Sequence, residues 1–139
     1  MRTTVDHFLT RPRTTIPFTH EPPDARTRLH ATTRRRGRAT IVCPRGAADA
    51  YTLLTWKHML REAADTTDPP GPLVIDTDRL EFLSCRALGV LADEADRCRR
   101  HCIDLRLAGS QPAVARLVEA AGLHVRLPVF EEVDAAAPR

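Results

Sequence analysis

The chain of 139 residues is long enough for one globular domain with a sizeable core, and a second domain is not expected. Hydrophobic residues make up 42% but aromatic residues only 4%, which predicts a core of Leu, Val, Ile and Ala and no aromatic platform for stacking nucleic-acid bases. The 21 Lys and Arg residues stand against 18 Asp and Glu, so the net charge of +3 does not indicate a nucleic-acid partner.

The start of the chain and its apolar runs bear on cellular location. No apolar segment typical of a signal peptide is present, and no apolar run approaches the roughly 20 residues that span a membrane. We therefore expect a cytoplasmic protein with reduced thiols and no direct membrane insertion. Residues 1–25 hold four prolines and show no sustained apolar period, which is typical of a disordered arm.

Residues 26–139 carry the patterns of a folded domain. Two short strands are expected on either side of Gly37, and Ile41 and Val42 make the second a buried strand. Four arginines fall at the tip of this hairpin, where we expect a solvated turn rather than a nucleic-acid or lipid patch. They are Arg34, Arg35, Arg36 and Arg38.

A helix and a central strand are expected next. Residues 46–64 predict an amphipathic helix with Asp49 as its N-cap, and residues 65–72 have the composition of a loop. Residues 73–76, LVID, form a compact apolar run without alternation, which predicts a strand covered on both faces.

The second half of the chain continues the alternation of helices and strands. From Arg86 onward, apolar residues recur at steps of three and four and predict a second helix. Its core stripe comprises Leu88, Leu91, Ala92, Ala95, Cys98 and Cys102. Residues 103–109 predict a strand, and residues 110–122 a third helix that Ser110 caps and Gly122 ends.

Residues 123–130 predict a last strand, and residues 131–137 a short terminal helical turn. Strand–helix–strand units of this kind form right-handed crossovers between parallel strands. The expected fold class is therefore α/β, a single domain with a mixed, mostly parallel sheet of about five strands packed with three to four helices.

Four short elements carry a family resemblance. GAAD keeps Gly46 and Asp49 of a Gly-Glu-Leu-Asp element, LVID ends at Asp76 where a strand-end Asp is usual, and GLHVRLPVF is a faithful closing strand. With LEFLSCRALGVL between them, the chain resembles STAS domains, the family of anti-sigma-factor antagonists, from about residue 26 to residue 137. The resemblance implies a STAS-like fold and a regulatory, protein-binding function in a bacterial cell.

LEFLSCRALGVL departs from the family at the head of the second helix. Aligned through Phe82 and LGVL, which we expect to hold the helix in place, the family's Asp-Ser-Ser-Gly corresponds to Ser84, Cys85, Arg86 and Ala87. In phosphoregulated members the first Ser of this quartet receives phosphate from an anti-sigma factor that is itself a kinase. A phosphate there would add nearly two negative charges at a helix start.

Cys85 carries a thiol in place of that hydroxyl, so phosphorylation switching is expected to be lost or altered. Ser84 remains phosphorylatable, but its side chain would point about 100° away around a helix of 3.6 residues per turn. A helix dipole and Arg86 can activate the Cys85 thiol for redox sensing. The alternative, which we favour, is a small half-buried residue that fills the space of a serine.

The run CRRHC has the spacing of metal ligands, because Cys98, His101 and Cys102 share one side of a helix. Both cysteines also continue the core stripe, and we therefore favour buried structural thiols. His58 has no nucleophile motif nearby, and Asp49 and Asp76 are better read as a cap and a strand end than as an acid–base pair. We expect no enzyme activity, cofactor or metal.

The leading functional hypothesis is a regulatory binding module that docks on an anti-sigma factor of serine-kinase type. The expected docking face comprises Asp49, Asp76, Ser84, Cys85, Arg86, Ala87 and Leu88. One alternative is an accessory STAS subunit of a lipid-transport type membrane transporter. A second is a thiol-based redox sensor at Cys85, beside which no base or resolving cysteine can be placed from the sequence.

Overall fold

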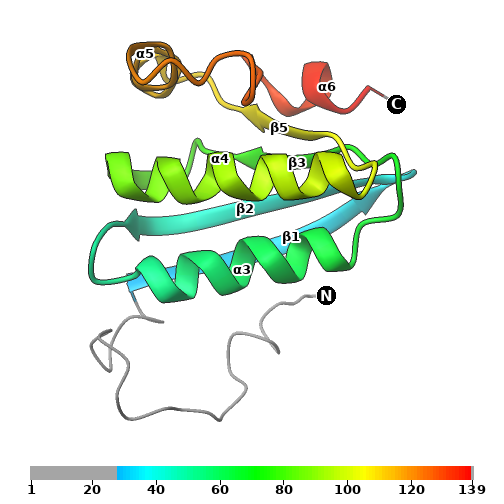
Figure 1. The fold of residues 1–139 in the computed structure, drawn as a ribbon, viewed down its shortest axis with the longest axis horizontal. Helices are drawn as coiled ribbons and strands as arrows, with labels where there is room; N and C mark the ends of the chain where they lie inside the picture. The colour runs from blue at the N-terminus through cyan, green and yellow to red at the C-terminus, as the bar shows by residue number, and fades with distance from the viewer. Residues whose placement is uncertain (1–27, 139) are drawn as a thin grey trace, which may run out of the picture.

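The computed structural model describes residues 28–138, and the arm expected at residues 1–25 lies outside them (Figure 1). The elements in chain order are β1 (Leu29–Arg36), β2 (Ala39–Ala48), α3 (Leu53–Asp65), β3 (Leu73–Asp76), β4 (Leu80–Leu83), α4 (Cys85–Arg100), β5 (Leu105–Ala108), α5 (Pro112–Ala120), β6 (Val129–Phe130) and α6 (Val133–Ala136). This α/β alternation confirms the predicted fold class.

The strands form one six-stranded sheet in the order β1-β2-β3-β5-β6, with β4 pairing to β2 outside this path. β1 and β2 form an antiparallel hairpin, while β3, β4, β5 and β6 each join by parallel pairing. The prediction of a hairpin followed by parallel crossovers is therefore confirmed. β2 is long enough to pair with β3 along its first half and with β4 at its end.

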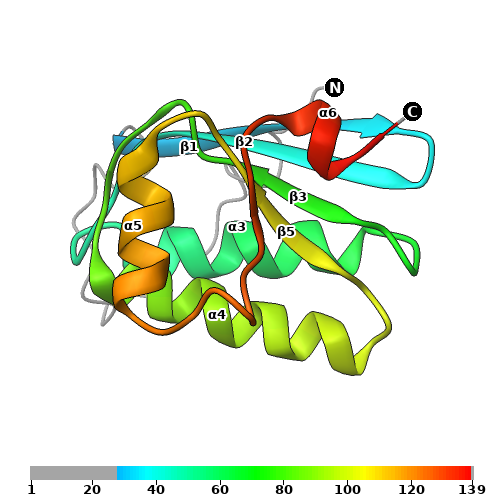
Figure 2. The same cartoon turned by 90° about the horizontal axis from the view of Figure 1, so that it is seen from above.

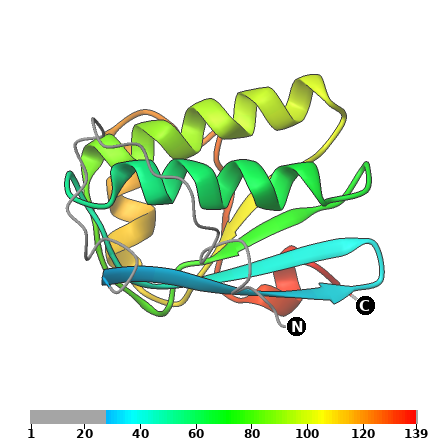
Figure 3. The ribbon, with the colours of Figure 1, turned by 90° about the horizontal axis from the view of Figure 1, so that it is seen from below.

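Helices α3 and α4 cover one face of the sheet, which we call the inner face, and α6 lies on the opposite, outer face (Figure 3). The inner face holds the larger core, where Trp56, Leu60, Ile75, Leu91 and Leu107 are fully buried. The outer face holds a smaller core under α6. Figure 2 shows α5 near the start of α4, at the opposite end of the domain from α6.

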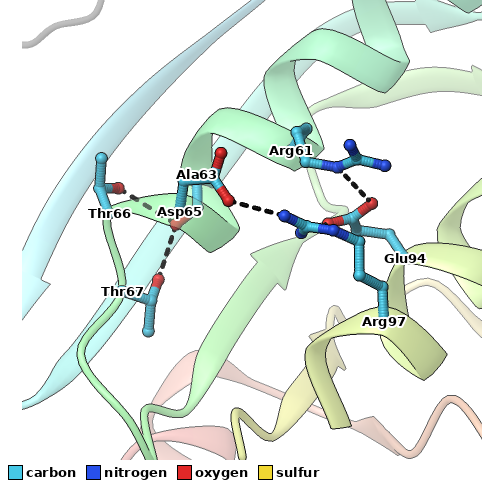
Figure 4. Close-up of polar contacts among 7 residues, drawn as sticks. All are labelled: Arg61, Ala63, Asp65, Thr66, Thr67, Glu94 and Arg97. Carbon is cyan, nitrogen blue, oxygen red and sulfur yellow. Dashed lines mark hydrogen bonds and ion pairs between the residues drawn. The ribbon is translucent and has the colours of Figure 1, made fainter. Parts of the chain in front are cut away.

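A buried carboxylate joins α3 to α4 (Figure 4). Glu94 is only 6% exposed, and it accepts from Arg97 at 2.7 Å and from Arg61 at 3.2 Å. Arg97 also donates to Asp65 at 2.9 Å, so one guanidinium bridges the two helices. Thr66 and Thr67 donate to the Ala63 carbonyl and close the end of α3. These contacts hold the second half of α4 against the end of α3.

Two predicted helix starts are wrong. β2 continues through residue 48, so α3 begins at Leu53 rather than directly after Asp49, and Thr52 rather than Asp49 precedes it. Likewise α5 begins at Pro112 after Gln111, so Ser110 is not its cap. In both cases one or more non-helical residues lie between the predicted cap and the first residue of the helix. The predicted stop at residue 122 is confirmed, since that glycine has a φ of 71° just beyond the helix.

The strand predictions are wrong in three places. Residues 123–128 form turns, leaving only Val129 and Phe130 as β6, because Leu107 and Ala108 are the only β5 residues that pair with it. β5 begins at residue 105, not 103. β4 has no counterpart in the predicted strands, since its pairing with β2 depends on residues more than 30 positions away.

Candidate partner-binding site

The start of α4 is held by hydrogen bonds at Ser84. This residue has extended backbone angles, its N–H donates to the Ala48 carbonyl at 2.9 Å, and its Oγ accepts from the Ala87 N–H at 3.0 Å. Ser84 is therefore the N-cap of α4 and lies before the helix. The predicted 100° offset from Cys85 around a helix does not apply, because Ser84 is not a helical residue.

Ala87 and Leu88 lie beneath the surface, at 0% and 1% exposure. The indole N–H of Trp56 donates to the Ala87 carbonyl at 2.9 Å and ties this first turn to α3. The two residues were predicted to belong to the docking face. They can only support that face from below, because a partner cannot reach them.

Cys85 and Arg86 are the exposed residues of the first turn. The interpretation of Cys85 as half-buried is wrong, because Ala87 and Leu88 form the buried side of this turn and Cys85 faces solvent. Among residues 28–138, Arg86 makes no ion pair or hydrogen bond through its guanidinium. The structure therefore presents a free thiol and a free cation side by side.

The other cysteines lie away from Cys85. Cys102 follows the far end of α4, a helix of 16 residues and thus about 24 Å long. Cys98 is buried, and burial raises the pKa of its thiol to about 11. Cys43 lies on β2, half-buried. Within residues 28–138, the structure places no other cysteine beside Cys85.

The predicted pair of buried thiols in CRRHC is right for Cys98 and wrong for Cys102. α4 ends at Arg100, and Cys102 has a left-handed φ of 63° in the following turn, where it is exposed. Within residues 28–138, no group of three His, Cys, Asp or Glu side chains is arranged to hold a metal ion. None of the helices in the same range has the length and apolarity to span a bilayer.

Asp49 orders the loop between β2 and α3. Its Oδ1 accepts from the N–H groups of Tyr51 at 2.9 Å and Thr52 at 3.2 Å. Thr52 is fully buried and its hydroxyl donates to the Ala47 carbonyl at 2.7 Å. These hydrogen bonds hold the loop in one conformation. Because the Ser84 N–H donates to the carbonyl of Ala48, the residue before Asp49, the structure brings Asp49 and the start of α4 together.

Two exposed aromatic side chains flank this region, and neither was predicted as a site residue. Tyr51 is 59% exposed and Phe82 is 55% exposed, although Phe82 was expected to pack against the helix. Phe82 pairs with Ala47 across a β-bulge, at the end of β2 that leads into the Tyr51 loop. The bulge changes the face to which β4 residues point, so periodicity alone does not reveal this exposure.

Asp76 lies on the other side of the sheet. Alternation along β3 puts it on the outer face with Val74, and its charge acts on Cys43, whose pKa is raised first by burial and then by this carboxylate. Its Oδ1 accepts from the Asp78 N–H at 3.0 Å. The structure therefore does not bring Asp76 together with Ser84 and Cys85, which lie where α4 begins on the inner side.

Known proteins match this chain over most of its length. Residues 30–136 match the model of the STAS domain. A Mycobacterium tuberculosis protein named as an anti-anti-sigma factor, Rv2638, is 44% identical over 117 residues, which cover 84% of this chain and 79% of that protein. RsfA of the same species, named as an anti-sigma-F factor antagonist, is 41% identical over 108 residues, 78% of this chain and 84% of RsfA.

Solved structures share the fold. An anti-sigma factor antagonist from Mycobacterium paratuberculosis superposes with a TM-score of 0.68 at 23% identity, covering 84% of this chain and 94% of that one. The anti-sigma factor antagonist SpoIIAA, in its unphosphorylated form, gives 0.59 at 14% identity, with 76% and 92% coverage. With a family model over residues 30–136 and relatives above 40% identity, the chain belongs to the STAS domain family.

Proposed function

We propose that this STAS domain is a non-enzymatic regulator that binds an anti-sigma factor and antagonises it. The observation that carries the proposal is that Tyr51, Phe82, Cys85 and Arg86 are all exposed where the loop after β2 is hydrogen-bonded to the start of α4 through Ser84. Tyr and Arg are enriched among the residues that dominate binding energy at protein interfaces. The names of the two mycobacterial relatives support an anti-sigma factor as the partner.

The proposed partner is an anti-sigma factor of serine-kinase type that binds this chain but does not phosphorylate it. Cys85 is not an ordinary acceptor for a serine kinase, and the Ser84 hydroxyl is engaged with the Ala87 N–H. Without a phosphate, the start of α4 does not gain the charge of about −1.5 to −2 that would oppose binding. We therefore propose that binding persists when the kinase has ATP.

A phosphotransfer and binding assay tests this proposal. The full chain and its Cys85→Ser variant are mixed with each candidate anti-sigma kinase, with and without Mg-ATP. The native chain should bind in both conditions and take up no phosphate. Cys85→Ser should take up phosphate and be released. Phosphate on Ser84 of the native chain would contradict the proposed lack of phosphorylation, and binding to no anti-sigma factor would contradict the partner assignment.

Aromatic substitutions test the proposed interface itself. Phe82→Ala and Tyr51→Ala should each weaken binding about tenfold or more, as loss of an interface hot spot does, while leaving thermal stability close to native. Val125→Ala is the matched control, because Val125 is 80% exposed and lies in the turn after α5. Equal losses from Val125→Ala and Phe82→Ala would refute the location of the interface.

The two alternative functions gain no support of their own. The relatives are named as regulators of anti-sigma factors, which does not favour a transporter subunit. A redox sensor at Cys85 lacks a cysteine beside it within the described residues. Both stay predictions, and neither is proposed as the function.

A further inference from the structure

The outer face of the sheet is covered at one end only. There Ala136 at the end of α6 and Ala137 after it pack on small and branched residues of three strands, among them Ile41, Val74 and Ala108. α6 lies near the turn of the β1–β2 hairpin (Figures 2 and 3). The remainder of the outer face of β1 and β2 has no covering helix within residues 28–138.

Polar side chains occupy that open part of the face. The strand register opposes Thr32 to Cys43, Arg34 to Ile41 and His30 to Arg45, and opposed residues of an antiparallel pair share one face. Because Ile41 packs under α6, this register assigns Arg34 and Arg45 to the outer face. Both arginines are exposed.

A third arginine, Arg79, belongs to the same cluster. Arg79 lies next to Arg45, because its carbonyl accepts from the Gly46 N–H at 3.4 Å, and the charges of Arg34, Arg45 and Arg79 all act on the half-buried thiol of Cys43. None of the three makes an ion pair or hydrogen bond through its guanidinium within residues 28–138. Asp76 is the acidic side chain among the charges that act on this thiol.

Two other arginines on the outer face contact α6 and the residue that follows it. Arg36 lies under α6 and donates to the Asp134 carboxylate at 2.7 Å and to the Ala137 carbonyl at 3.2 Å. Arg106 donates to the Ala136 carbonyl at 2.6 Å. At its covered end, the outer face therefore holds a short helix through an acidic side chain and the carbonyls at its C-terminal end.

We propose that Arg34, Arg45 and Arg79, the arginine patch, form a docking surface for an acidic segment of a partner protein, which lies on the outer face beside α6. The chain's own first 27 residues do not have the required charge, since they hold four arginines against three acidic residues. A second copy is also disfavoured, because each chain has a net charge of +3. The proposal does not depend on the anti-sigma factor function.

A titration of the full chain tests the arginine patch. The probes are a fluorescein-labelled peptide of Glu and Ala, its counterpart with Gln in place of Glu, and a single-stranded DNA oligonucleotide of equal charge. The Glu peptide should bind at low salt and the Gln peptide should not. Amide shifts in a ¹⁵N-labelled sample should centre on residues 30–34 and 43–46 and leave residues 82–88 unchanged.

Substitutions identify the residues responsible. Arg34→Gln, Arg45→Gln and Arg79→Gln should each weaken peptide binding about two- to fivefold, the range of an exposed ion pair. The triple variant should fold as the native chain does, because these guanidinium groups have no partner among the described residues to lose. The matched control is Arg100→Gln with Arg116→Gln, two exposed arginines on α4 and α5 that also lack partners within residues 28–138.

Three results would overturn the proposal. The first is native-like peptide affinity in the triple variant, and the second is an equal loss in the Arg100 and Arg116 control. The third is tighter binding of the oligonucleotide than of the Glu peptide, which would assign the patch to nucleic acid. Binding of the anti-sigma factor is measured separately on the same variants, so failure of the patch and failure of the proposed function are distinguishable.

Discussion

The hydrogen bond that caps α4 gives a prediction at the centre of the site. Ser84→Ala removes the acceptor for the Ala87 N–H, now 3.0 Å away, and leaves that donor without its partner at a helix start. Loss of a serine cap costs about 1 kcal/mol of unfolding free energy, within a range of roughly 0.5–2 kcal/mol. For a domain of this size, that corresponds to a fall in Tm of about 5 °C.

Two further variants separate capping from other roles of Ser84. Ser84→Asp should retain near-native stability, because aspartate caps a helix well and its charge suits the helix N-terminus. Ser84→Gly should lose only a few tenths of a kcal/mol. Urea unfolding and thermal denaturation of the four proteins measure the order. Equal destabilisation by Ala and Asp would refute the capping role, since a cap distinguishes them and simple loss of a serine does not.

Three other predictions concern the core and the thiols. Glu94→Gln should lower the unfolding free energy, measured with urea, by about 2–3 kcal/mol, because it weakens a buried ionic bridge. Asp65→Asn changes an exposed carboxylate and should cost under about 1 kcal/mol. Similar losses in the two variants would contradict the greater weight given to the buried carboxylate. The free energy of unfolding should fall by roughly 2–3 kcal/mol as the pH rises from about 9 to about 11, because the folded Cys98 pKa of about 11 exceeds the ordinary value of 9.0 and the unfolded thiol ionises first. Cys98→Ala should lose this part of the pH dependence of stability, and an unchanged pH dependence in that variant would refute the role of Cys98. Ellman's reagent should label Cys85 and Cys102 rapidly, half-buried Cys43 more slowly and buried Cys98 only after unfolding, and a single fast thiol would contradict the exposures described.

Patterning predicts most of the fold because burial dominates it. The apolar run LVID is the central strand β3, and the three- and four-residue steps through Leu88, Leu91 and Cys98 are the buried side of α4. These patterns report on large apolar areas removed from water, a strong and largely local signal. Cys102 breaks the pattern, because the helix ends two residues before it.

Polar residues near helix starts mislead, because a cap and a turn use the same side chains. Asp49 bonds N–H groups two and three residues ahead, as a cap does, yet the chain makes a turn there and α3 starts later. Ser110 likewise interacts with Asp78 in another loop, not with α5. Ser84 does act as a cap. Composition alone does not separate these cases, since the difference lies in the following backbone angles.

The arginine run 34–36 shows why the site could be predicted only in part. As a run of like charges it indicates a solvated hairpin tip, but the residues belong to β1 and alternate between its faces. Arg35 reaches Asp68 beyond the end of α3, while Arg36 reaches Asp134 on the opposite side. Arg34 points to the same face as Arg36 but beyond α6. Within residues 28–138 Arg34 has no ion pair, and the contacts that distinguish it from Arg36 come from residues about 100 positions away, which the sequence around Arg34 does not contain.

The altered quartet at residues 84–87 divides into two pairs with different roles. Ser84 and Ala87 are joined by the cap hydrogen bond, and Ala87 is fully buried, so this pair maintains the start of α4. Cys85 and Arg86 are exposed and take no part in that bond. The chain can therefore replace the exposed chemistry of the site without altering the helix that presents it. For this reason Cys85→Ser should change phosphate acceptance, and Ser84→Ala should change the unfolding free energy. The double variant should show both changes, each as large as in the single variant.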